Sequence, residues 1–152
     1  MNNTDTIQIR ELTSEQEWTE AHKVFVTLRP RLPLKDLLDR RESLLSRGYR
    51  LLGLYDGATL IAIAGIQILP HVLRGQDLRV HDFATHAEHL SRGYGRCLLN
   101  HMRTIAKNEG CSRIMLHSRM ENTRAHSFYL GQGFDRLGFE FGLELAGEDS
   151  IE

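Results

Sequence analysis

The chain has 152 residues, of which 41% are hydrophobic and 26% charged, and its 19 Lys and Arg nearly balance 20 Asp and Glu. A chain of this size and composition fits one globular domain that buries roughly 70% of the extended chain's surface. The net charge of −1 excludes a strongly cationic surface for nonspecific binding to nucleic acid or membranes. No apolar run reaches the roughly 18 residues of a membrane span, and residues 1–12 lack the apolar core of a signal peptide. We therefore expect a soluble cytoplasmic protein with no nucleic-acid or membrane partner.

The two cysteines, Cys97 and Cys111, are too few for a disulfide framework in a chain of this length. Cys97 falls in an apolar helical run, and Cys111 comes just before an expected strand. Both are interpreted as small buried side chains with reduced thiols, which agrees with a cytoplasmic location.

The first third of the chain is expected to form one strand and two helices. Residues 7–12 (IQIREL) alternate between apolar and polar side chains, which predicts a strand. Residues 13–17 hold the pattern of a capping box in front of apolar residues at helical spacing. Residues 28–33 (LRPRLP) end this helix, and Pro33 fits the first turn of a second helix that ends before Gly48.

The middle third is expected to form three strands and a helix. Asp56 and Gly57 separate two apolar runs and predict the tight turn of a hairpin. Pro70 is expected to stop the second strand of this hairpin. A third strand covers residues 77–85, and an amphipathic helix that ends at Gly110 follows it after a glycine-rich loop.

The last third is expected to add a strand, a helix and one or two final strands. Residues 112–118 (SRIMLHS) are interpreted as a buried strand, and residues 122–133 as a helix capped by Asn122. Residues 134–145 (FDRLGFEFGLEL) are expected to supply one or two last strands before a polar tail. This order of elements predicts an α/β domain, with one mixed sheet and helices packed on its faces.

Residues 89–99 (HLSRGYGRCLL) place two glycines and two arginines at the start of the amphipathic helix. The first N–H groups of a helix have no acceptor within the helix, and the helix dipole adds positive potential there. Gly93 and Gly95 leave room for an anion beside the backbone. Arg92 and Arg96 add positive charge, so the segment fits a phosphate or pyrophosphate. Taken alone, it fits a solvated glycine-rich turn equally well.

Two segments resemble the GNAT superfamily, the acetyl-CoA-dependent N-acetyltransferases. Residues 90–102 (LSRGYGRCLLNHM) are similar to its pyrophosphate loop, Q/R-x-x-G-x-G/A, with Leu90 in place of the usual Gln or Arg. Residues 122–134 (NTRAHSFYLGQGF) are similar to its fourth helix, N-x-x-A/S-x-x-F/L-Y-x-x-x-G-F, at Asn122, Ala125, Phe128, Tyr129, Gly133 and Phe134. The resemblance implies a GNAT-like fold for a single domain over residues 1–152. That fold is a mixed, mostly antiparallel sheet, splayed between its fourth and fifth strands and flanked by about four helices.

The resemblance also implies that acetyl-CoA is the co-substrate. The pyrophosphate would meet backbone N–H groups of the loop formed by Leu90, Ser91, Arg92, Gly93, Tyr94, Gly95 and Arg96. The pantetheine arm would lie beside the strand end formed by Phe83, Ala84 and Thr85, and it would pair with the exposed backbone of Phe83 and Thr85. Asn122 would reach the same arm, and a plain helix cap is the alternative interpretation of this residue.

Acetyl transfer requires a neutral amine and a stabilised thiolate leaving group. The resemblance assigns Tyr129 to the position whose hydroxyl faces the CoA sulfur, where a phenol can donate; a core aromatic is the alternative. The catalytic base is left open between Asp82 and His81, which should point to opposite faces of their strand unless a bulge intervenes. Histone-acetylating members usually carry a glutamate where this chain has Arg79, which argues against that subgroup.

Arg29 and Arg31, in the segment between the first two helices, are the candidate contacts for a carboxylate on the acceptor. A solvated helix end is the alternative. His86 and His89 stand three residues apart without an acidic third ligand at a recognised spacing. They are interpreted as solvated loop side chains, and we expect no metal site.

The sequence therefore predicts an N-acetyltransferase that moves an acetyl group from acetyl-CoA to a primary amine of a small molecule, by direct transfer in a ternary complex. Acetylation of a protein or peptide amine, and non-catalytic binding of acyl-CoA as a sensor, stay open as alternatives. C-terminal strands often pair in this superfamily, so a homodimer is among the expected assemblies.

Overall fold

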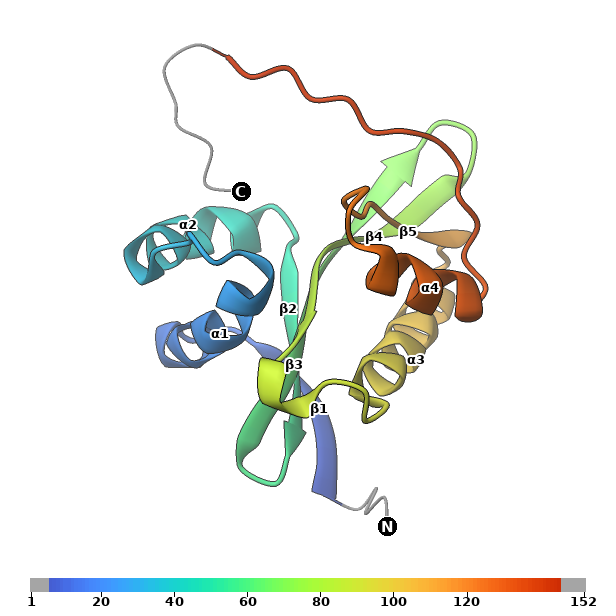
Figure 1. The fold of residues 1–152 in the computed structure, drawn as a ribbon. Helices are drawn as coiled ribbons and strands as arrows, with labels where there is room; N and C mark the ends of the chain where they lie inside the picture. The colour runs from blue at the N-terminus through green and yellow to red at the C-terminus, as the bar shows by residue number, and fades with distance from the viewer. Residues whose placement is uncertain (1–5, 146–152) are drawn as a thin grey trace.

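The computed structural model describes residues 6–145 and contains a five-stranded sheet with the strand order β1-β2-β3-β4-β5 (Figure 1). The strands are β1 (Ile7–Leu12), β2 (Arg50–Asp56), β3 (Thr59–His71), β4 (Gly75–Thr85) and β5 (Arg113–Leu116). Neighbouring strands are antiparallel, except for β4 and β5, which are parallel. The predicted mixed and mostly antiparallel sheet is confirmed.

The helices lie on both faces of the sheet (Figure 1). Helices α1 (Glu15–Leu28) and α2 (Leu34–Ser46) cover one face, and α3 (Tyr94–Asn108) and α4 (Thr123–Gly131) cover the other. A short 3-10 helix, η2 (Ala87–His89), leads from β4 toward the glycine-rich loop. Within residues 6–145, every helix is too short or too polar to cross a bilayer. The predicted fold class is therefore confirmed.

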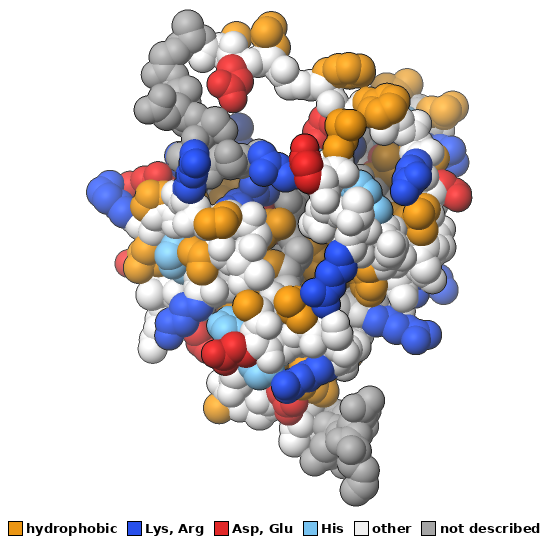
Figure 2. All heavy atoms as spheres, viewed as in Figure 1, with side chains coloured by type: hydrophobic (Ala, Val, Ile, Leu, Met, Phe, Trp, Pro, Cys, Tyr) orange, Lys and Arg blue, Asp and Glu red, His pale blue; other side chains and the backbone are white. Residues whose placement is uncertain are grey.

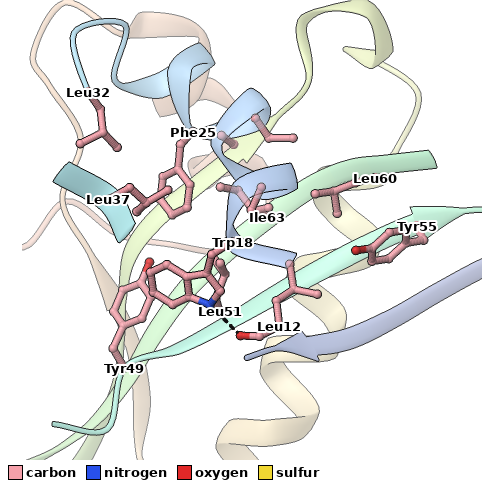
Figure 3. Packing of buried hydrophobic residues seen from close by; sticks show 13 residues of the cluster. Leu12, Trp18, Phe25, Leu32, Leu37, Tyr49, Leu51, Tyr55, Leu60 and Ile63 are labelled. Atoms are coloured by element: carbon pink, nitrogen blue, oxygen red, sulfur yellow. Dashed lines mark hydrogen bonds between the residues drawn. The ribbon is translucent and has the colours of Figure 1, made fainter. Parts of the chain in front are cut away.

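Trp18 lies in the core between α1, α2 and the sheet (Figure 3). Its side chain is fully buried, and its indole Nε1 donates to the carbonyl oxygen of Leu12 at 2.9 Å. Helix α1 begins after Ser14, whose hydroxyl accepts the N–H of Glu17 at 3.1 Å while the Glu17 carboxylate accepts the N–H of Ser14 at 3.1 Å. The predicted capping box is confirmed, with Ser14 as the N-cap residue.

A second core lies between α3 and the opposite face of the sheet. Leu98, Leu99 and Met102 of α3 are fully buried there, against strand residues such as Ile66. Each such side chain stabilises the fold by about 2 kcal/mol relative to exposure to water. The predicted end of this helix is confirmed, because Gly110 follows it with a φ of +74°.

Strand β3 continues through Pro70, so the prediction that Pro70 stops this strand is wrong. The pairing of β3 with β2 ends at Ile66, and Pro70 lies beyond that point, opposite Gln76 of β4. Proline lacks an N–H group and is tolerated where one side of a strand has no partner. The hairpin of β3 and β4 therefore projects past β2, with Pro70 on its free edge.

Residues 132–145 form no helix or strand, so the expected last strands over residues 134–145 are absent from the described structure. Within the described residues, no strand covers the outer edge of β5. Strand β5 is therefore only half-buried, and the prediction of a buried strand is wrong. Cys97 and Cys111 are free thiols, as expected, but they are half-buried rather than buried. The polar tail, residues 146–152, lies outside the described residues.

Strands β4 and β5 pair only over residues 77–80 and 113–116. The buried Asp77 carboxylate accepts two hydrogen bonds from Arg113, from Nε at 2.8 Å and from Nη2 at 3.1 Å. These bonds hold the pKa of Asp77 below its usual range. Beyond Val80, β4 continues to Thr85 without β5 beside it, which opens the sheet at the predicted place.

The substitution Asp77→Asn should lower the free energy of unfolding by about 2 kcal/mol at pH 7, because it weakens charged hydrogen bonds to Arg113. A carboxyl group whose pKa is lowered by folding stabilises the fold above its unfolded pKa and loses that contribution as the pH falls through its folded pKa. The difference between the two proteins, measured by urea unfolding, should therefore shrink below about pH 4. Asp39→Asn, which removes an exposed ion pair with Lys35, is the control and should cost less than about 1 kcal/mol. A difference for Asp77→Asn that is the same at all pH values would contradict this assignment.

Gly65 of β3 leaves room for the ring of Tyr49. A Cβ atom at position 65 would lie 1.8 Å from the hydroxyl oxygen of Tyr49, and this hydroxyl donates to Asp82 at 2.7 Å. Because Gly65 lies opposite Asp82 in the pairing of β3 with β4, the missing side chain allows the buried phenol to reach the carboxylate.

The substitution Gly65→Ala should displace the Tyr49 ring, break its hydrogen bond to Asp82 and lower the free energy of unfolding by about 2–3 kcal/mol. Gly131→Ala is the matched control, since a Cβ on this helical glycine meets no atom within 4 Å. The control should be neutral or slightly stabilising, because alanine favours a helix more than glycine does. Thermal or urea unfolding of both variants measures the effect, and equal stabilities would show that Tyr49 is not held at this position.

Candidate active site

Strand β4 contains one extra residue at His81. Gly65 of β3 pairs with Asp82 and the next residue, Ile66, pairs with Val80, so His81 has no counterpart on β3. Such a bulge changes the direction of the side chains that follow it. The sequence predicted opposite directions for His81 and Asp82 unless a bulge intervened, and a bulge does intervene. Both side chains line one cavity on the face of the sheet that α1 and α2 cover.

This cavity has a volume of about 420 Å³ and lies between α1, α2 and the bulged region of the sheet. Its apolar wall is formed by Phe25, Leu32, Leu37 and Leu44, of which the first three lie close together at the ends of α1 and α2 (Figure 3). The surface is hollowed between the side formed by α1 and α2 and the side formed by α3 and α4 (Figure 2). A volume of this size suits a small ligand.

Asp82 lies in this cavity with two donors. Arg29 Nε donates to its Oδ1 at 2.9 Å, and the Tyr49 hydroxyl donates to its Oδ2 at 2.7 Å. Burial, and then the charge of Asp82 and its hydrogen bond, raise the pKa of Tyr49 well above its usual value, so the phenol stays protonated. Arg29, expected to contact the acceptor, therefore lines the cavity with its Nε bound to Asp82. Arg31 is exposed and does not belong to the cavity lining.

The ring of His81 stacks against Tyr49, with a centroid distance of 6.1 Å and an interplanar angle of 23°. Its Nε2 lies 3.0 Å from Oε1 of Gln67, and the amide of Gln67 donates through Nε2 to the carbonyl oxygen of Arg47 at 2.6 Å. That second bond fixes the orientation of the Gln67 amide, so its oxygen faces the ring and the proton of the neutral imidazole belongs on Nε2. Nδ1 then carries the lone pair. Burial lowers the pKa of His81, so the ring is neutral at pH 7 and can accept a proton at Nδ1.

Sequence reasoning missed Gln67 and the two arginines of the cavity other than Arg29, namely Arg40 and Arg47. Gln67 is the one polar side chain in the run LIAIAGIQIL of β3, and that interruption was an available signal. Arg40 and Arg47 border this cavity because of the way α2 packs on the sheet. The sequence does not reveal that packing.

The end of β4 presents backbone groups on the side that β5 leaves open. The N–H of His86 donates to the carbonyl oxygen of Ile61 in β3 at 2.8 Å, and successive residues of a strand direct their backbone groups to alternate sides. Ala84 therefore directs its backbone groups toward β3, whereas Phe83 and Thr85 direct theirs toward the open side. These are the two residues whose backbone the sequence analysis assigned to a pantetheine arm.

The glycine-rich loop enters α3 through Gly93, which is the N-cap residue and has a φ of +84°. Ser91 also has a positive φ, of 62°, and its hydroxyl accepts a hydrogen bond from Arg124. Across the described part of the chain, the N–H groups of residues 90–96 find no backbone or side-chain acceptor. Arg92, Arg96 and Leu90 are exposed. The loop thus offers a row of free donors beside two cationic side chains, which is a suitable geometry for an anion.

Tyr129 of α4 belongs to a group of aromatic rings that includes Phe83, at a centroid distance of 6.4 Å, and Phe134, at 5.6 Å. Burial raises the pKa of Tyr129, which keeps its phenol protonated at neutral pH. Among the described residues, its hydroxyl has no hydrogen-bond partner, and it is not one of the fully buried polar atoms. Asn122 caps α4, because its side-chain oxygen accepts the N–H of Ala125 at 3.3 Å.

His86, Glu88 and His89 place one potential metal-ligand atom each within 4.8 Å of the others. The acidic neighbour that sequence reasoning found missing is therefore Glu88. His86 Nδ1, however, accepts the N–H of Glu88 at 3.2 Å, which assigns the proton of the neutral ring to Nε2. This hydrogen bond caps the first turn of η2.

Known proteins are similar to this chain in sequence and in fold. The Acetyltransferase (GNAT) family matches residues 10–134 of the chain. The protein described as uncharacterized N-acetyltransferase YhdJ of Bacillus subtilis is 31% identical over 134 residues, which cover 88% of this chain and 92% of that protein.

Solved structures agree on the fold. A GNAT family acetyltransferase of Staphylococcus aureus has a TM-score of 0.77 at 22% identity, and the match covers 92% of this chain and 99% of that one. The aminoglycoside N-acetyltransferase AAC(6')-Iy, solved in complex with CoA, has a TM-score of 0.79 at 16% identity over 93% of this chain and 95% of that one. Because the family match extends from β1 to the end of α4 and so spans both the bulged strand and the glycine-rich loop, this chain belongs to the GNAT acetyltransferases and is an acyltransferase.

Proposed function

We propose that this chain, as a single GNAT domain, transfers an acetyl group from acetyl-CoA to a primary amine of a small molecule, directly within a ternary complex. The observation that carries the proposal is the row of N–H groups at residues 90–96 without acceptors, beside a strand end with open backbone groups. The pyrophosphate binds these donors, and pantetheine pairs with the backbone of Phe83 and Thr85. The likeness in fold to AAC(6')-Iy, whose structure contains CoA, supports this assignment.

The acceptor amine must lose a proton before or during its attack on the thioester. An alkyl amine with a pKa near 10.4 costs about 4–5 kcal/mol to deprotonate at pH 7. We assign this step to Nδ1 of His81, because the ring is neutral and its Nε2 is already bound to Gln67. Asp82 is a positioning residue, since Arg29 and Tyr49 already occupy its two oxygens.

The amine nitrogen attacks the carbonyl carbon of the thioester, a C–N bond forms, and the C–S bond breaks. The nitrogen loses two protons in turn, one before its attack and one as the amide forms, and His81 accepts each and releases it to solvent. The departing thiolate accepts the phenolic proton of Tyr129, which solvent then restores. Tyr129 suits this role because its hydroxyl is protonated and has no partner among the described residues.

A small-molecule acceptor is favoured because the cavity beside His81 has a volume of about 420 Å³, within the range of small-ligand sites. The acylation of a protein or peptide amine would need a longer groove leading to His81. Binding of acyl-CoA without catalysis would not require a base, whereas the hydrogen bonds from Gln67 to His81 and Arg47 orient the His81 ring as one.

The test is release of free CoA thiol from acetyl-CoA across a panel of primary amines, together with calorimetric titration of acetyl-CoA. Tyr129→Phe should lower kcat by about 10²–10⁴-fold and change the affinity for acetyl-CoA little, because the hydroxyl acts mainly in the transition state.

Gly93→Val tests the glycine-rich loop. A β-branched residue is strained at the positive φ of Gly93, so the affinity for acetyl-CoA should fall. Acetyl-CoA binding without turnover on any amine would instead identify a sensor, and an unchanged kcat for Tyr129→Phe would remove its catalytic role.

We also propose that the protein is a homodimer joined through its C-terminal segment. Residues 137–145 alternate strictly, and Leu137, Phe139, Phe141, Leu143 and Leu145 are 67–90% exposed. In Figure 1 the segment extends away from the sheet, and within the described residues the outer edge of β5 has no partner. An alternating apolar strand without a partner is a surface for pairing. The segment of one copy therefore pairs with β5 of a second copy.

The double substitution Phe139→Ser/Phe141→Ser should convert the dimer to a monomer, because it removes two apolar side chains from the paired face. Light scattering after size-exclusion chromatography measures the mass of each species. Glu140→Gln is the control, since Glu140 lies on the other side of the alternation, 3.0 Å from His117, and should leave the dimer intact. A wild-type protein that stays monomeric at high concentration would overturn the proposed dimer.

A further inference from the structure

The charges of the cavity beside His81 and Asp82 do not balance. Three arginines line it, Arg29, Arg40 and Arg47, but Asp82 is the only carboxylate among its lining residues in the described part of the chain. Because burial lowers the pKa of His81, its ring adds no positive charge at pH 7. Arg29 is paired with Asp82, which leaves the charges of Arg40 and Arg47.

Arg40 lies on the face of α2 that borders the cavity, and Arg47 is the C-cap residue of the same helix. Leu37, Arg40, Leu44 and Arg47 follow at spacings of three, four and three residues, so all four lie on the same side of α2 and of its C-cap. A helix face turned toward the interior is normally apolar throughout. The two arginines are exposed and border the cavity at its solvent side, beside leucines that contact the core.

Neither guanidinium is used elsewhere in the described structure. Within residues 6–145, the guanidinium groups of Arg40 and Arg47 form no ion pair or hydrogen bond, although the carbonyl oxygen of Arg47 accepts a hydrogen bond from Gln67. Other cations of the same helix do have partners: Lys35 pairs with Asp39 at 2.6 Å, and Arg41 donates to the carbonyl oxygen of Thr13. Two unpaired arginines over an apolar wall thus face a cavity that is lined mainly by apolar groups.

We propose that the acceptor is an amino-carboxylic acid whose carboxylate binds Arg40 and Arg47, while its amine lies toward His81. This inference rests on the acetyltransferase function proposed above and names its substrate class. Guanidinium groups bind carboxylates with two parallel hydrogen bonds, and the leucines and Phe25 provide an apolar wall for the carbon skeleton between the two charged ends.

The same charges disfavour other amines. A positive potential around the acceptor lowers the pKa of its amine, which assists deprotonation by His81. It also repels polycationic acceptors, so we expect a different acceptor class from the aminoglycosides named for AAC(6')-Iy, whose fold is similar.

The first experiment measures kcat/KM for matched amines: ω-amino acids with two to eight carbons and phenylalanine, each beside the amine that lacks the carboxylate, and linear diamines. We expect the carboxylate to raise kcat/KM by about tenfold or more, and diamines to be the poorest acceptors. Arg40→Gln and Arg47→Gln should each raise KM for the amino acid by about tenfold, with KM for acetyl-CoA unchanged. Lys35→Gln removes the same charge from the exposed side of α2 and should change neither KM.

The second experiment does not depend on turnover. Carboxylates without an amine, such as hexanoate and 3-phenylpropionate, should bind the wild-type protein in calorimetric titrations more tightly than the matching amides do. Arg40→Gln/Arg47→Gln should remove that preference. If no amine is acetylated but the carboxylate preference is present, the proposed function fails and the carboxylate site stands. If amines are acetylated without regard to a carboxylate and the preference is absent, the site is overturned and the acetyltransferase function stands.

Discussion

The extra residue of β4 at His81 is the constraint on which the rest of the site depends. Without the bulge, His81 and Asp82 would point to opposite faces of the sheet, and only one of them would border the cavity. Gly65 stands opposite the bulge and lets the Tyr49 ring approach, and Tyr49 in turn holds Asp82. The positions of His81, Asp82 and Tyr49 in the cavity therefore follow from a local change in strand register.

The bulge also separates the roles of two adjacent titratable side chains. Asp82 is buried, but Arg29 and Tyr49 supply a charge and a donor, so its carboxylate is bound on both oxygens. His81 is half-buried without a comparable partner on Nδ1, and burial lowers its pKa. Neighbouring groups whose environments differ in this way can serve as one structural anion and one proton acceptor. In the proposed mechanism, the packing of Tyr49 and Arg29 against Asp82 therefore leaves His81 as the base.

The elements that local patterns specify were predictable from the sequence. The capping box at Ser14, the Asp56-Gly57 turn and the Gly110 helix end each depend on a few adjacent residues, and all three were confirmed. Features that depend on which strands are neighbours were not predictable. Pro70 is tolerated only because β2 ends earlier than β3 does, and residues 134–145 alternate like a strand but have no pairing partner in the described chain. Gln67, Arg40 and Arg47 line the same cavity only because β3, β4 and α2 pack together, and the sequence does not reveal that packing.

The two halves of the site differ in the kind of group that forms them, which explains why the sequence identifies the family but not the acceptor. The proposed cofactor half consists mainly of backbone: free N–H groups at residues 90–96 and the open edge at residues 83–85. Backbone geometry requires glycines and helix starts at fixed spacings, so it leaves a recognisable pattern in the sequence. The proposed acceptor half consists mainly of side chains from α1, α2, β3 and β4, and their spacings along the chain are unrelated. Exchanging a few of these side chains, such as the two arginines on α2, changes the charge of the cavity without disturbing the cofactor half, so acceptor specificity can diverge within one unchanged fold.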